Sequence, residues 1–260
     1  MAEGLKERER MQSRNDEKLE RFKIDPPRFI VYIDGYNFYA AINHSEPRDL
    51  FRLGWCNFEK LSSKLVSLAF DLQGATSPQV VVKYFTSRVS HKANTASAGE
   101  ETRQSLWLEA LKAETGIVPI LGMHKARPDG KRKEKWTDVN IAITMTQDVA
   151  NRPSGMILIS GDHDFEPVVE KVAASQIPVI VFCPHGHKIY APPVGKECGR
   201  RIRTSYLTQE ILKDCRLSAE KLWDEYLDLK IKSSTLKGAR SPYQGCREFD
   251  EEQRKNRVRL

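Results

Sequence analysis

The stretch FIVYIDGYN, residues 29–37, decides the fold. Five β-forming apolar residues are followed at once by Asp34, Gly35 and Asn37, so a strand is predicted to end in a polar turn. The apolar run does not alternate with polar residues, which is typical of a strand buried on both faces of a parallel sheet. Four more runs of this kind predict strands at 79–85, 117–121, 156–160 and 177–182.

Helical patterns separate the predicted strands. They cover residues 36–43, 57–70, 99–114, 137–151 and 163–175, and two more follow at 206–213 and 217–231. Strands that alternate with helices predict an α/β fold. We expect a three-layer sandwich with a mainly parallel, five-stranded central sheet.

Composition limits the class of protein. The chain has 260 residues, of which 40% are hydrophobic and 30% charged, so it can bury a core and is not disordered throughout. An excess of 42 Lys and Arg over 35 Asp and Glu gives a net charge of +7 and favours a polyanionic partner. No apolar run approaches the roughly 20 residues of a membrane span, and the charged N-terminus has no apolar leader, so we expect a cytoplasmic protein without a membrane partner. Five widely spaced cysteines predict reduced thiols.

Three regions are expected along the chain. Residues 1–23 form a charged arm or helix, 24–216 the main domain, and 217–260 an amphipathic helix with a basic tail. The tail either contacts nucleic acid or only keeps the chain soluble.

Acidic residues gather where the predicted strands end. Asp34 follows the first strand, Asp162 and Asp164 follow the fourth, and Asp138 opens the helix at 137–151. Ligands of open parallel sheets bind at the carboxyl ends of the strands. Four carboxylates there would repel one another unless a cation neutralised them, and oxygen ligands alone favour Mg²⁺ or Mn²⁺. Such a site suits phosphodiester hydrolysis.

Each acid also has a simpler interpretation. Asp34 and Asn37 can form a turn and helix cap, Asp162 and Asp164 can cap the helix at 163–175, and Asp138 can favour the first turn of its helix. Taken together at one sheet edge, the acids favour the metal site over four separate caps.

Three segments carry a resemblance to a known family. Residues 31–38 (VYIDGYNF), 135–139 (KWTDV) and 159–165 (ISGDHDF) resemble, in order and separation, the signature segments of the NYN domain family, including its LabA-like branch. That family belongs to the PIN-like nuclease superfamily. The resemblance covers roughly residues 28–212.

The resemblance implies a PIN-like fold and metal-dependent RNA cleavage that leaves a 5′-phosphate and a 3′-hydroxyl. By matching motif, the metal ligands would be Asp34, Asp138, Asp162 and Asp164. Asn37 would orient a ligand or the substrate phosphate, and Ser160 would assist beside the paired acids. The pair at 136–137 (WT) departs from the glycine and apolar residue that the family often shows there.

Several other residues have two interpretations. Lys131, Arg132, Lys133 and Lys135 are placed to hold substrate phosphates, or they form a solvated loop. His163 either touches the substrate or is an exposed loop histidine. Trp107 is expected in the core rather than as a stacking platform, and a zinc site at 183–187 (CPHGH) would lack a fourth ligand.

The sequence therefore predicts an Mg²⁺- or Mn²⁺-dependent ribonuclease, an endonuclease that acts on single-stranded RNA. One alternative is a non-catalytic, RNA-binding regulatory scaffold. Another is a phosphoesterase, although the DxDx[ST] run of haloacid-dehalogenase-type enzymes does not follow the first strand. A homodimer or a regulatory protein partner is compatible with the sequence, but no sequence feature fixes either.

Overall fold

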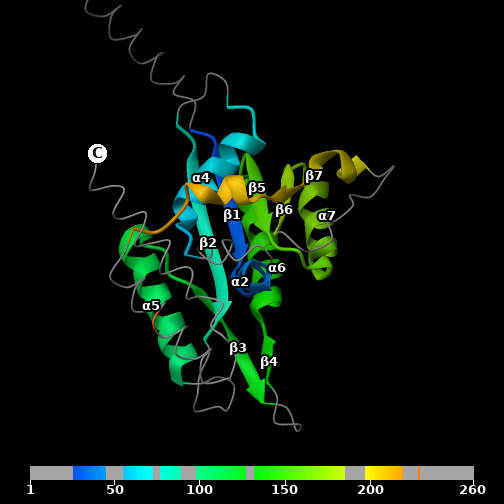
Figure 1. The fold of residues 1–260 in the computed structure, drawn as a ribbon. Helices are drawn as coiled ribbons and strands as arrows, with labels where there is room; N and C mark the ends of the chain where they lie inside the picture. Colours follow the sequence, from blue (N-terminus) through cyan, green and yellow to red (C-terminus); the bar gives the residue numbers. More distant parts are fainter. Residues whose placement is uncertain are drawn as a thin grey trace, which may run out of the picture.

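Seven strands form one sheet in the order β4-β3-β2-β1-β5-β6-β7 in the computed structural model (Figure 1). The structure describes residues 26–44, 55–72, 77–88, 98–126, 132–184, 197–218 and 228. The strands are β1 (Arg28–Asp34), β2 (Gln79–Ser87), β3 (Ile120–Ala126), β4 (Arg132–Lys135), β5 (Gly155–Ile159), β6 (Val179–Pro184) and β7 (Ile202–Leu207). Every neighbouring pair is parallel except β3 and β4.

Helices cover both faces of this sheet, so the predicted three-layer α/β sandwich is confirmed. One face carries α2 (Gly35–His44), α4 (Phe58–Ala69), α5 (Ala98–Thr115) and α8 (Gln209–Lys213). The other carries α6 (Thr137–Asp148) and α7 (Glu166–Ala174). Short 3-10 turns are η2 (Val149–Asn151), η3 (His163–Phe165) and η4 (Glu197–Arg201). None of the helices that the structure describes is both long and apolar enough to cross a bilayer.

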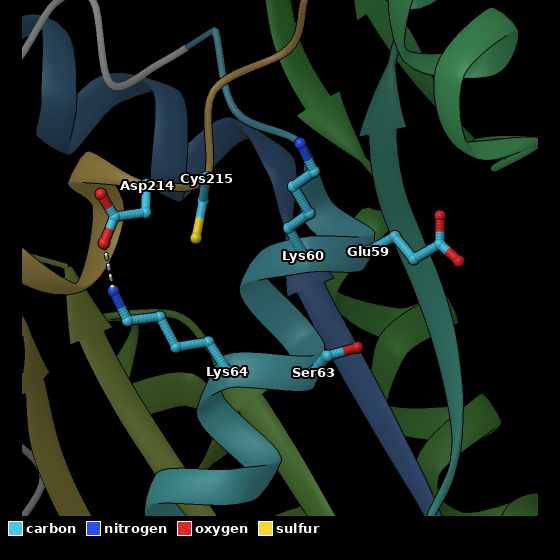
Figure 2. A pocket seen from close by; sticks show the side chains of 6 residues that line it. All are labelled: Glu59, Lys60, Ser63, Lys64, Asp214 and Cys215. Atoms are coloured by element: carbon cyan, nitrogen blue, oxygen red, sulfur yellow. Dashed lines mark hydrogen bonds and ion pairs between the residues drawn. The ribbon is translucent and has the colours of Figure 1, made fainter. Parts of the chain in front are cut away.

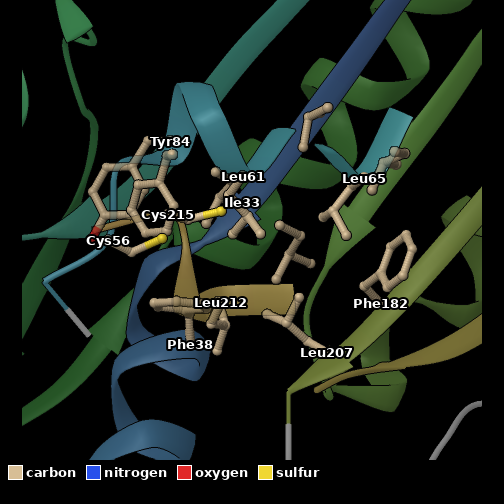
Figure 3. Packing of buried hydrophobic residues seen from close by; sticks show 14 of the residues in the cluster. Ile33, Phe38, Cys56, Leu61, Leu65, Tyr84, Phe182, Leu207, Leu212 and Cys215 are labelled. Carbon is tan, nitrogen blue, oxygen red and sulfur yellow. The ribbon is translucent and has the colours of Figure 1, made fainter. Parts of the chain in front are cut away.

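Strand β1 lies at the centre of the sheet and supplies both halves of the core. Phe29, Val31 and Ile33 pack against the layer that contains α4, while Ile30 and Tyr32 pack against α6 and α7. This two-sided burial is what the unbroken apolar run predicted. Figure 3 shows Ile33 among the buried side chains of the first layer.

The sheet has six parallel strands and one antiparallel strand, so the expected count of five is wrong. Residues 206–213 were expected to be helical, but β7 continues to Leu207 and α8 begins at Gln209. The basic run that precedes α6 is strand β4 rather than a loop. Strands β4 and β7 lie at the two edges of the sheet, where a strand has one neighbour and does not need an apolar pattern on both faces.

Two strands begin two or more residues later than predicted. Strand β3 begins at Ile120 rather than at 117, and β6 begins at Val179 rather than at 177. Pro119 and Pro178 precede them, and proline cannot donate a hydrogen bond to a strand ladder. The arm at 1–23, the basic tail and all of the predicted helix at 217–231 except Leu217, Ser218 and Asp228 lie outside the described residues.

A buried polar network ties α6 to the middle of the sheet. The Asp148 carboxylate at the end of α6 accepts a hydrogen bond from the Tyr32 hydroxyl at 2.7 Å and pairs with the Lys83 ammonium at 2.6 Å. Asn151 donates to its other oxygen at 3.4 Å. Asp148 therefore has a packing role, in which it holds the end of α6 against β1 and β2.

Breaking this network should destabilise the protein. We expect Asp148→Ala to lower the free energy of unfolding by about 2–3 kcal/mol, because Lys83 loses its partner in a largely buried place. Urea denaturation measures the change. Asp214→Ala is the matched control, because its ion pair with Lys64 is exposed, and it should cost less than about 1 kcal/mol. Equal losses in the two variants would contradict a special role for the buried pair.

Tyr32 should reveal the same network through pH. Burial first, and then the Asp148 carboxylate, raise the pKa of the Tyr32 phenol far above its ordinary value of 10.0. Above about pH 10 the unfolded chain releases this proton while the folded chain keeps it, so the free energy of unfolding falls with rising pH. The slope should be steeper by about 1.4 kcal/mol per pH unit than in Tyr32→Phe. Parallel curves for the two proteins between about pH 9 and pH 11 would show that Tyr32 titrates normally.

Candidate active site

The strand order reverses between β1 and β5, and the carboxyl end of this strand pair, with Asp34 and residues 160–164, is called the crevice below. From β1 the chain moves outward through β2 and β3, and then it returns to the other side of β1 to form β5, β6 and β7. In open α/β sheets, ligands bind outside the carboxyl ends of the strands at such a switch point. Asp34 ends β1, and residues 160–164 follow β5, so most of the predicted site residues belong to this crevice.

Asp34 is the buried centre of the site. Its side chain is 4% exposed, and both carboxylate oxygens accept hydrogen bonds. The backbone N–H of Asn37 donates to Oδ1 at 3.0 Å, and the Ser160 hydroxyl donates to Oδ2 at 2.9 Å. These two bonds fix the orientation of the Asp34 carboxylate.

Another hydrogen bond joins the two sides of the crevice. The Asn37 side-chain oxygen accepts the backbone N–H of Gly161 at 2.8 Å, which joins α2 to the turn after β5. The Asn37 amide nitrogen points to no acceptor among these contacts and can donate to a ligand. Asn37 therefore links the two walls of the crevice, rather than only capping a helix.

The turn after β5 is held by its own side chains. The Ser160 oxygen accepts the backbone N–H of Asp162 at 3.1 Å, and Asp162 Oδ1 accepts the backbone N–H of Asp164 at 2.9 Å. Ser160 is buried, whereas Asp162 and Asp164 are exposed. Asp162 thus has the capping role that was the simpler alternative for this residue, at η3, and its predicted role as a metal ligand stays a prediction.

The remaining predicted residues lie on α6, η3 and β4. Asp138 is exposed in the first turn of α6. His163 is half exposed, and its Nδ1 lies 2.6 Å from Glu166 Oε1. Arg132, Lys133 and Lys135 lie on β4, while Lys131 falls outside the described residues.

The donor chemistry of the acids fits a hard divalent cation, because carboxylate and hydroxyl oxygens meet here without histidine or cysteine ligands. Within the described ranges, however, no three His, Cys, Asp or Glu side chains are grouped so that they could hold one metal ion. Mg²⁺ commonly uses one or two carboxylates and completes its shell with water and substrate phosphate. The residues therefore fit an ion held by Asp34 with one neighbouring acid, and the four-carboxylate site stays a prediction.

Two alternative sites receive little support. Cys183 is a buried thiol whose pKa is raised by burial, and His185 and His187 of the zinc interpretation lie outside the described residues. Trp107 packs edge-on against Phe58 and Tyr84, so the prediction of a core role is confirmed.

An open hollow of about 520 Å³ beside α4 and α8 contains none of the predicted site residues (Figure 2). Its lining residues are Glu59, Lys60, Ser63, Lys64, Asp214 and Cys215.

The comparisons agree with this geometry. Residues 28–194 match the NYN domain. The chain belongs to the NYN domain family. NYN domains are PIN-like nuclease domains, so the family predicted from the three segments is confirmed, and the chain is nuclease-like and RNA-related. The LabA-like branch stays a prediction.

Other similarities are distant. The crystal structure of a protein of unknown function from Vibrio parahaemolyticus is 19% identical to this NYN protein, with a TM-score of 0.46. The similarity covers 72% of this chain and 97% of that chain. No curated protein matches the chain.

Removing the Ser160 hydroxyl should loosen the crevice. We expect Ser160→Ala to lower the free energy of unfolding by about 1–2 kcal/mol, because the buried Asp34 carboxylate loses a donor and Asp162 loses an acceptor. Urea denaturation measures the loss. Ser67→Ala is the control, since the Ser67 hydroxyl bonds to the Ser63 carbonyl on an exposed helix face, and it should change stability by less than about 0.5 kcal/mol. A Ser160 variant as stable as the parent would show that Asp34 does not depend on this bond.

Proposed function

We propose that this NYN protein is a metal-dependent endoribonuclease whose reaction centre is the crevice between β1 and β5. One observation carries the proposal: the buried Asp34 carboxylate is fixed by Ser160 across the switch point of the sheet. A carboxylate is costly to bury, and a chain tolerates that cost where the charge has a partner or a use. Membership of a nuclease family favours a catalytic use of the Asp34 carboxylate.

Mg²⁺ or Mn²⁺ would be held by Asp34 together with Asp162, Asp164 or Asp138. When bound, such an ion lowers the pKa of water and stabilises a leaving oxygen. Ser160 keeps the Asp34 oxygens in one orientation. Asn37 has its side-chain oxygen occupied by Gly161, so its amide can donate to a phosphate oxygen.

Substrate phosphates would lie along β4. Arg132, Lys133 and Lys135 belong to this short strand, which leads directly into the helix that carries Asp138. Cations so close to the acids hold a polyanion against a centre that would otherwise repel it. His163 lies at the rim on η3 and takes the role of a substrate contact in this proposal.

The proposal predicts a strict dependence on Asp34 and Asp162. We expect Asp34→Asn and Asp162→Asn to reduce cleavage of single-stranded RNA by about 100-fold or more, because amides hold hard cations poorly. Chelation of divalent ions should abolish cleavage in the parent, and Mn²⁺ or Mg²⁺ should restore it. The cut ends should carry a 5′-phosphate and a 3′-hydroxyl, which end-specific ligation tests.

Asp214→Asn provides the control for this experiment. Asp214 is an exposed acid beside Lys64 in the hollow of Figure 2, so its loss should leave cleavage within about twofold of the parent. RNA binding without cleavage under any divalent ion would favour the regulatory scaffold instead. Turnover of a small phosphomonoester in place of RNA would favour a phosphoesterase.

A further inference from the structure

Trp136 combines two unusual features. Its side chain is 50% exposed, although tryptophan is a large apolar residue. Its backbone has φ 80° and ψ −15°, in the left-handed region, where bulky residues are rare and strained. Its side chain makes no capping hydrogen bond to α6, so helix capping does not account for a tryptophan here.

The sheet register gives the position of Trp136 relative to Asp34. Asp34 pairs with Phe85 across β1 and β2, and Phe85 pairs with Ile120 across β2 and β3. Asp34 and Ile120 therefore lie at the same position along the strand direction. Lys135 pairs with Met123, and Trp136 follows directly. Trp136 therefore lies about two residues beyond the height of Asp34 and about three strands to one side. This displacement is roughly 15 Å at 3.3 Å per residue and 4.8 Å per strand.

The ribbon formed by β3 and β4 adds charge beside Trp136. Strand β3 pairs with β2 only as far as Gly122, so Met123–Ala126 and Arg132–Lys135 project past the carboxyl end of β2 (Figure 1). Those eight residues include four Lys or Arg and one Glu. Lys125 pairs with Lys133 in this ladder, so the ribbon carries two basic residues at one register position.

Tyr36 is a second exposed aromatic residue at this edge. It lies two residues after Asp34 and is 60% exposed, just as Trp136 lies two residues before Asp138. An exposed aromatic therefore adjoins each of two predicted catalytic acids. Aromatic rings beside a cationic track are the features with which proteins bind single-stranded nucleic acid, because every unpaired base offers a face for stacking.

We propose that Trp136 is a base-stacking platform that receives single-stranded RNA between the β3–β4 ribbon and the Asp34 crevice. The inference rests on the proposed function, and it names the substrate as RNA with unpaired bases. The ribbon cations hold the phosphate backbone while an unpaired base of the same strand, away from the cleaved bond, stacks on the indole. Tyr36 stacks a base on the α2 side of the crevice. Paired bases in a duplex are already stacked and cannot occupy these rings.

The test measures binding rather than cleavage. A fluorescein-labelled oligouridylate is titrated with the full chain in the presence of a chelator, and anisotropy reports the Kd. We expect Trp136→Gly and Trp136→Leu to weaken binding roughly 5- to 100-fold, as loss of one stacked base predicts. Trp136→Phe keeps an aromatic ring and should bind within about threefold of the parent. Labelled duplex RNA should bind the parent and Trp136→Gly equally.

Two controls separate stacking from damage to the fold. Glycine adopts a positive φ without strain, so Trp136→Gly should melt at the same temperature as the parent or higher even though it binds RNA less tightly. Ile143 is also 50% exposed on α6, but it lies seven residues, or roughly 10 Å, along the helix from Trp136. Ile143→Ala should therefore leave the Kd unchanged.

The outcomes distinguish this inference from the proposed function. If the parent binds and cleaves RNA while every Trp136 variant binds equally well, the stacking platform is wrong and the nuclease proposal stands. If Trp136→Gly instead turns a dimer into a monomer in sedimentation with an unchanged Kd, the surface contacts a second copy and the platform is again wrong. If the parent neither binds RNA in chelator nor cleaves it with Mg²⁺ or Mn²⁺, both proposals fail.

Discussion

The structure depends on keeping one carboxylate buried at the centre of the sheet. Asp34 ends the middle strand and is almost entirely removed from water, which is costly for a charged group unless donors surround it. Those donors come from Asn37 on the same side of the switch point and from Ser160 on the other. The bond to Ser160 requires β1 and β5 to end together, as the pairing of Ile33 with Ile159 provides. Strand register and sheet topology thus bring this pair of side chains together and set the geometry of the site.

Helix α6 meets a related requirement at its far end. Asp138 in its first turn is exposed, whereas Asp148 in its last turn is buried and held by Lys83 and Tyr32. The two acids are roughly 15 Å apart along the helix, so they cannot share an ion. Asp148 instead anchors the helix to β1 and β2, and this anchor determines where Asp138 lies relative to Asp34. Two acids on one helix therefore have separate uses, one in packing and one at the crevice rim.

The sequence was sufficient for the buried strands because their apolar runs have no other stable location. It was insufficient for β4 and β7, since an edge strand such as RKEK or IRTSYL is held by backbone hydrogen bonds that leave little trace in its side chains. The positions of Asp34, Asp162 and Asp164 could be predicted because these acids directly follow predicted strands. The bond from Ser160 to Asp34 spans 126 residues, and the pair of Lys83 and Asp148 spans 65. No local pattern encodes such contacts, because they arise from sheet order and helix docking.

In this NYN protein, the residues proposed for catalysis and those proposed for substrate binding have different structural requirements. A group that must be aimed within a fraction of an ångström benefits from burial and several hydrogen bonds, as Asp34 and Ser160 have. A group that receives many different bases must stay exposed and needs only a flat face, as Trp136 and Tyr36 offer. Strain at Trp136 then has a physical rationale: the turn from β4 into α6 would be less strained with glycine, but glycine has no ring to present. Backbone strain thus lies at Trp136, where the substrate is proposed to bind, while Asp34 and Ser160 keep their hydrogen bonds in the buried centre.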